Sequence, residues 1–87
     1  MSDQDLRSHI KEMLVKNLML QVTTDQIGDD LPLFGPNGLG LDSIDALELV
    51  LGLEKEFGVV IEDRATAVKV LATIRSIAEF IQSQGKG

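Results

Sequence analysis

Residues 40–57 read GLDSIDALELVLGLEKEF and carry the strongest helix signal in the chain. At about 100° per residue, polar side chains gather on one stripe and apolar side chains cover an arc of about 220°, which only Glu54 interrupts. Asp42 and Asp45 suit the positive end of a helix dipole. The residues on the polar stripe are Asp45, Glu48, Gly52, Lys55 and Glu56. The pattern therefore predicts a helix over about 43–57.

Two other segments also show apolar residues at helical spacing, and a third is short and rich in Val. They predict helices over about 3–18, 64–71 and 74–83. Ser2 and Asp5 resemble a capping box for the first of these helices, while Thr73 is the expected N-cap and Gly85 the expected stop of the last. No segment alternates convincingly between polar and apolar residues. The predicted fold class is all-α: a small antiparallel four-helix bundle of three main helices and one short helix.

A long loop, residues 19–42, separates the first two predicted helices. Loops of this length usually serve a function or have structure of their own. Its end, GPNGLG at residues 35–40, is rich in turn residues and can lead the chain sharply into the next helix. Apolar anchors are Leu20, Val22, Ile27, Leu31, Leu33 and Phe34. We therefore expect the loop to pack over the bundle.

Composition indicates a single domain, residues 1–87, with a mainly aliphatic core, because 44% of the residues are hydrophobic and none is Trp or Tyr. The chain has no cysteine, which excludes disulfides, thiolate metal sites and thiol catalysis by the chain itself. The acidic residues do not fit a calcium-binding EF-hand loop, because Leu47 stands at the sixth position from Asp42, where glycine is required. No metal site is predicted.

The net charge of −6 is unevenly distributed, since residues 24–63 sum to −9 and residues 64–87 to +3. Such an acidic middle is repelled by phosphate backbones and attracted by basic protein surfaces. No apolar run is long enough to cross a membrane, and the polar residues 1–5 do not lead into a signal peptide. We expect a cytoplasmic, monomeric protein that binds neither nucleic acid nor membrane.

Two features of the helix over 43–57 have more than one interpretation. Ile44 and Leu51 border the polar stripe, so they belong either to the core or to an exposed docking surface beside acidic residues. The Ser43 hydroxyl, where the turn meets the helix, is either a simple N-cap or a functional group.

His9 is expected to be exposed and belongs to no recognisable triad, and Ser43 has no identifiable base. The chain is therefore not predicted to be an enzyme.

Residues 40–49, GLDSIDALEL, resemble the attachment motif of acyl carrier proteins, in which Asp-Ser is followed by an apolar residue. Residues 54–63, EKEFGVVIED, look like the end of that family's second helix and the loop after it. Asp29-Asp30-Leu31 resembles the family's upstream acidic element. The resemblance covers nearly the whole chain in order.

The resemblance implies that Ser43, flanked by Asp42, carries covalent 4′-phosphopantetheine, placed there by a separate phosphopantetheinyl transferase. Acyl intermediates of fatty-acid or related lipid or polyketide biosynthesis would then ride as thioesters on the thiol of this group. Partner enzymes with basic docking surfaces would contact Ile44, Asp45, Glu48, Leu51 and Glu54. The acyl chain would be sheltered by the bundle, with candidate lining residues Leu47, Val50, Ile61, Leu71 and Ile77.

Some residues depart from the common pattern of that family. The loop ahead of the serine is longer, and Lys55, Arg64 and Lys69 place positive charge where acidic residues are usual. These changes favour a specialised carrier dedicated to one pathway. Two alternatives stay open: a carrier of aminoacyl or peptidyl cargo on the same fold, and an unmodified acidic adaptor that binds a basic protein.

Overall fold

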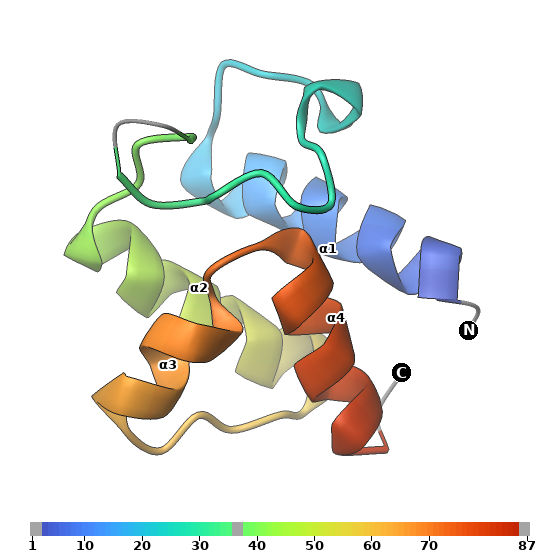
Figure 1. Cartoon of the computed structure of the whole chain (residues 1–87), viewed down its shortest axis with the longest axis vertical. Helices are drawn as coiled ribbons and strands as arrows, with labels where there is room; N and C mark the ends of the chain where they lie inside the picture. The colour runs from blue at the N-terminus through green and yellow to red at the C-terminus, as the bar shows by residue number, and fades with distance from the viewer. Residues whose placement is uncertain (1–2, 36–37, 86–87) are drawn as a thin grey trace.

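A computed structural model describes residues 3–35 and 38–85, and every regular element in these ranges is helical (Figure 1). The elements are α1 (Asp3–Leu18), the 3₁₀ helix η1 (Thr24–Gln26), α2 (Ser43–Phe57), α3 (Arg64–Val70) and α4 (Ile74–Ser83). The all-α prediction is confirmed, and each predicted helix agrees with the observed one to within one residue. The capping role expected of Ser2 lies outside the described residues.

The core lies where α1 meets α2 and α4. From α1 it receives Leu6, Ile10, Met13 and Leu14, whose spacing places them on one face. α4 adds Ile74, Ile77, Ala78 and Ile81, and α2 adds Leu49 and Leu53. Full burial of such an aliphatic side chain stabilises the fold by about 1.5–3 kcal/mol, so this aliphatic cluster is the main source of stability, and the half-buried Phe34, Phe57 and Phe80 pack against it.

Gly52 is buried on α2, although the sequence pattern placed it on the polar stripe. A Cβ at this position would lie 2.7 Å from Nδ2 of Asn17 and 3.3 Å from Sδ of Met13. The two helices therefore approach closely through the missing side chain. This packing offsets the cost of about 0.5–1 kcal/mol that glycine carries inside a helix relative to alanine.

The long loop between α1 and α2 packs over the bundle, as predicted (Figure 1). Ile27 and Leu33 are buried, and the Leu33 N–H donates to the Ala72 carbonyl at 3.0 Å. The loop also contains η1 and an isolated bridge between Phe34 and Leu41, neither of which the sequence pattern predicted. Its path is thus fixed by contacts with segments far away in the sequence.

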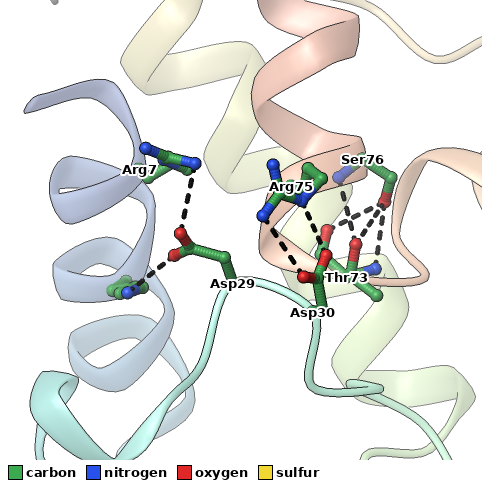
Figure 2. A network of polar contacts seen from close by, with 7 residues as sticks. Arg7, Asp29, Asp30, Thr73, Arg75 and Ser76 are labelled. Carbon is green, nitrogen blue, oxygen red and sulfur yellow. Dashed lines mark hydrogen bonds and ion pairs between the residues drawn. The ribbon is translucent and has the colours of Figure 1, made fainter. Parts of the chain in front are cut away.

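Two acidic residues of this loop bind basic residues of the helices (Figure 2). Asp29 lies 3.1 Å from Nη1 of Arg7 and 2.9 Å from Nζ of Lys11, while Asp30 accepts from Nε of Arg75 at 2.6 Å. A hydrogen bond from Lys11 and the nearby positive charges lower the pKa of Asp29, and the Arg75 guanidinium lowers that of Asp30. The acidic surface left for partners is therefore smaller than the sequence charge indicates.

Beside these ion pairs lies the start of α4, where Thr73 is the N-cap, as predicted (Figure 2). Its Oγ1 accepts from the Ser76 N–H at 3.1 Å, and the Ser76 hydroxyl accepts from the Thr73 N–H at 3.0 Å. At the other end, Gly85 has a left-handed φ of 71° just after α4, which agrees with its expected role as a stop.

We expect Asp29→Asn to lower the free energy of unfolding by about 0.5–1 kcal/mol at neutral pH, because two partly exposed ion pairs are lost. A carboxylate whose pKa is lowered by folding stabilises the native state above its unfolded pKa of about 3.9, and this contribution disappears as the pH falls further. The difference in Tm from the native chain should therefore be full above about pH 5 and shrink below pH 4.

Thermal unfolding followed by circular dichroism between pH 3 and pH 7 measures this effect. Asp25→Asn is the matched control, because the Asp25 carboxylate pairs with no side chain in residues 3–35 or 38–85. A difference in Tm between Asp29→Asn and the native chain that stays constant from pH 3 to pH 7 would contradict the ion pairs assigned to Asp29.

Candidate functional site

The start of α2 is capped by Asp42. Its Oδ1 accepts from the N–H groups of Ile44 at 3.0 Å and Asp45 at 3.1 Å. In return, Oδ2 of Asp45 accepts from the Asp42 N–H at 3.1 Å, which completes a capping box. Ser43 is consequently the first residue of the helix and not its cap.

The Ser43 side chain is exposed and forms no hydrogen bond with any described residue. The interpretation of Ser43 as a simple N-cap is therefore wrong, because its neighbour Asp42 already binds the free N–H groups. A hydroxyl that has no role in capping and faces solvent is accessible to a modifying enzyme.

The turn before Asp42 determines where the helix starts. Gly40 has a φ of 72°, a left-handed conformation that glycine adopts without strain. The next residue, Leu41, is buried, and its N–H donates to the Leu33 carbonyl at 3.1 Å. The turn is thereby anchored to the buried part of the long loop, and this fixes the position of Ser43 as the first residue of α2.

A pocket of about 700 Å³ lies between α2 and α3, and Ser43 and Asp42 belong to its lining. Most of the other lining residues are apolar: Pro32, Phe34, Leu41, Ala46, Leu47, Val50, Ala67, Val68, Leu71 and Ala72. The volume lies in the range of small-molecule sites in proteins, about 300–1,000 Å³. The arrangement can therefore receive an apolar chain beside the Ser43 hydroxyl.

The residues expected to line a shelter for an acyl chain divide into two groups. Leu47, Val50 and Leu71 line the pocket. Ile77 does not, because it is fully buried in the core, and the half-buried Ile61 packs against that core. Sequence reasoning missed the contributions of Pro32, Phe34 and Leu41, which come from the long loop, and of Ala46, Ala67, Val68 and Ala72. No helical spacing marks the loop residues as pocket residues.

One side of α2 is exposed and apolar. Ile44 is 71%, Leu47 59% and Leu51 45% exposed, so this end of the apolar arc does not belong to the core. Glu48 and Glu54 are exposed on the same helix, whereas Asp45 is half-buried. The choice between core and surface is thus settled in favour of an exposed surface for Ile44 and Leu51.

His9 is partly exposed, with a side-chain exposure of 36%, so the expectation of an exposed histidine holds in part. Its Nε2 lies 3.2 Å from Oε2 of Glu56, and its ring centroid lies 4.9 Å from that of Phe57. Both contacts are at the end of α2 opposite Ser43. His9 therefore joins α1 to α2 and is not placed to act as a base for the Ser43 hydroxyl.

Within residues 3–35 and 38–85, no group of three His, Cys, Asp or Glu side chains is placed to hold a metal ion. In the same ranges no helix is long and apolar enough to cross a membrane.

Comparison with known proteins places these features in a family. A family model described as the phosphopantetheine attachment site matches residues 8–81. Acyl carrier protein 5, chloroplastic, of Arabidopsis thaliana is 49% identical over 45 residues, which are 51% of this chain and 30% of that protein. Acyl carrier protein 1, chloroplastic, of Casuarina glauca is 41% identical over 44 residues, which are 51% of this chain and 31% of that protein. The matched parts are thus about half of this chain and less than a third of each relative. Because the family model extends from α1 to α4, the chain belongs to the phosphopantetheine attachment site family.

Proposed function

We propose that this chain is an acyl carrier that bears 4′-phosphopantetheine on Ser43 and presents acyl groups to partner enzymes without catalysing a reaction itself. The observation that carries the proposal is the exposed, unbonded hydroxyl of Ser43 at the start of α2, beside an apolar pocket. That the cargo is an acyl group is inferred from the two relatives, both of which are named acyl carrier proteins. A cytoplasmic location, a monomeric state and a role in fatty-acid or related lipid or polyketide biosynthesis are parts of the same proposal.

The residues around Ser43 suit this prosthetic group. The N-terminus of α2 favours a phosphodiester, because the helix dipole is positive there. Asp42 keeps the helix capped whether or not Ser43 is modified, since its carboxylate binds backbone N–H groups. The attached group supplies a thiol that holds acyl groups as thioesters, and the chain has no cysteine of its own.

The attachment requires coenzyme A and a separate transferase. A bond forms between Oγ of Ser43 and the phosphorus that bears the pantetheine arm, while the pyrophosphate bond to 3′,5′-ADP breaks. The hydroxyl proton leaves to a base of the transferase, because the neighbouring carboxylates of Asp42 and Asp45 already accept backbone N–H groups and the histidine contacts Glu56 at the far end of α2. The role of this chain is to expose the nucleophile on a rigid helix end.

The α2 surface supports docking of basic partner enzymes, the transferase and acyl-loading enzymes among them. Ile44 and Leu51 are apolar and exposed, and Glu48 and Glu54 lie on the same helix. Acidic side chains around an apolar contact speed the encounter with a basic surface, while the apolar residues provide short-range contact.

Intact mass spectrometry after incubation with coenzyme A and a broad-specificity transferase tests the proposal. The chain should gain the mass of one phosphopantetheine, and fragmentation should place that mass on Ser43. A chain that gains no mass while binding basic proteins through α2 would instead be an unmodified adaptor.

We also propose that the carrier is specialised. Lys55, Arg64 and Lys69 are all exposed and should repel enzymes that hold carriers through basic residues. Converting Lys55 and Lys69 to Glu should improve loading by a general malonyl transferase or ketosynthase several-fold at low salt, with Arg64 kept because it also lines the pocket beside Ser43. The gain should shrink as salt rises, because exposed charges are screened over about 8–10 Å at moderate salt. Equal loading of the native chain and a general carrier would remove the case for specialisation and leave the carrier function intact.

A further inference from the structure

Among the described residues, Arg64 is the one basic residue in the lining of the pocket between α2 and α3. The other charged lining residue that the structure describes is Asp42, whose Oδ1 accepts from the N–H groups of Ile44 and Asp45. The starts of α2 and α3, where Ser43 and Arg64 stand, lie on the same side of the molecule (Figure 1). An apolar pocket beside Ser43 thus contains one positive charge.

No acidic side chain in the described part of the chain forms an ion pair with Arg64. The preceding residue, Asp63, is the N-cap of α3 and accepts from the Thr66 N–H at 2.7 Å. Arg64 also stands at the first position of α3, where a positive charge opposes the helix dipole. Neither an ion pair nor the helix dipole therefore stabilises the fold through the guanidinium of Arg64.

We infer that Arg64 makes the pocket selective for acyl groups that carry a carboxylate at the end remote from the thioester. The inference rests on the proposed attachment of the prosthetic group to Ser43. The methylenes of the cargo contact the apolar lining, and the carboxylate accepts hydrogen bonds from the exposed guanidinium. The planar guanidinium forms paired hydrogen bonds with a carboxylate, a geometry that lysine does not offer.

Two eight-carbon cargoes test this selectivity. The transferase loads the chain from octanoyl-coenzyme A or from 7-carboxyheptanoyl-coenzyme A, and intact mass confirms each product. The rate of thioester cleavage by hydroxylamine then reports how well the pocket retains the cargo. The variants are Arg64→Gln, Arg64→Lys and Lys69→Gln, the last as a matched control because Lys69 lies on α3 outside the pocket lining.

Arg64→Gln should speed cleavage of the carboxylated thioester about threefold, the order expected for one partly exposed ion pair, and leave the octanoyl thioester unchanged. Arg64→Lys should have an intermediate effect, and Lys69→Gln should have none. Amide chemical shifts of Ala67 and Val68 should change on loading the carboxylated cargo in the native chain and change less in Arg64→Gln.

Equal effects of Arg64→Gln on both cargoes would overturn the inference, because they would place the guanidinium on the phosphodiester common to both products. The absence of any effect would overturn it as well and leave the carrier function standing. A chain that takes up no mass from either coenzyme A thioester would refute the carrier function and this inference together.

Discussion

Ser43→Ala is expected to fold as the native chain does and to accept no phosphopantetheine. The variant lacks the hydroxyl oxygen that would form the bond to phosphorus. Its fold should be unaffected, because Asp42 caps α2 and the Ser43 side chain bonds to no described residue. Alanine is also the better helix former, so the free energy of unfolding should change by no more than about 0.5 kcal/mol.

Intact mass after transferase treatment and thermal unfolding together measure both parts of this result. Ser83→Ala is the matched control, since it removes an exposed serine at the far end of α4 and should leave modification unchanged. Asp42→Ala provides the opposite contrast: it keeps Ser43 and should cost about 1 kcal/mol of stability through the lost cap. A gain of one phosphopantetheine by Ser43→Ala would show that another residue is the attachment site.

Reversing two charges on α2 should slow modification of the chain tenfold or more at low ionic strength. The change is Glu48→Lys together with Glu54→Lys, both at exposed positions. Electrostatic attraction raises association rates by about 10–10³-fold, so replacing attraction by repulsion should act mainly on the rate of encounter. Asp45 is kept, although it belongs to the proposed docking surface, because its carboxylate also bonds to the Asp42 N–H.

Initial rates of modification at about 0.05 M and 0.5 M salt measure this effect, because screening should remove most of it at the higher concentration. Glu12→Lys with Glu79→Lys is the matched control: it makes the same change in net charge on α1 and α4, at exposed positions. Ile44→Ala should slow modification at both salt concentrations, because its contact is apolar. Equal rates for the native chain and both double variants would exclude electrostatic steering through α2.

The helices could be predicted from the sequence because their signals are local. Apolar spacing and caps such as Thr73 depend on residues a few positions apart, and they gave the helix limits to within one residue. The 220° apolar arc of α2 did not reveal which edge is buried, because that depends on how closely α1 approaches through Gly52. The spacing of 100° per residue therefore placed Gly52 wrongly on the polar stripe, although it correctly placed Ile44 and Leu51 at the edge of the apolar arc.

The pocket was less predictable than the serine beside it. Ser43 stands in a motif of consecutive residues, so its position is readable without a structure. The pocket wall combines Pro32 and Phe34 of the long loop with Val68 of α3, and nothing in the spacing of these residues indicates that they meet. For the same reason Ile77, which has the helical spacing of a core residue, was wrongly expected in the pocket wall.

The uneven anchoring of the helices gives the two walls of the pocket different mobility. α3 contributes a single buried side chain, Val70, whereas α2, the opposite wall, contributes Leu49 and Leu53, and α1 and α4 each contribute four residues to the core. Segments with few buried contacts open at a lower free-energy cost than the core around them. The amides of α3 should accordingly exchange with deuterium through local opening events long before those of α1 and α4, while the bundle stays folded. One wall of the pocket can therefore yield to cargo of different length without global unfolding.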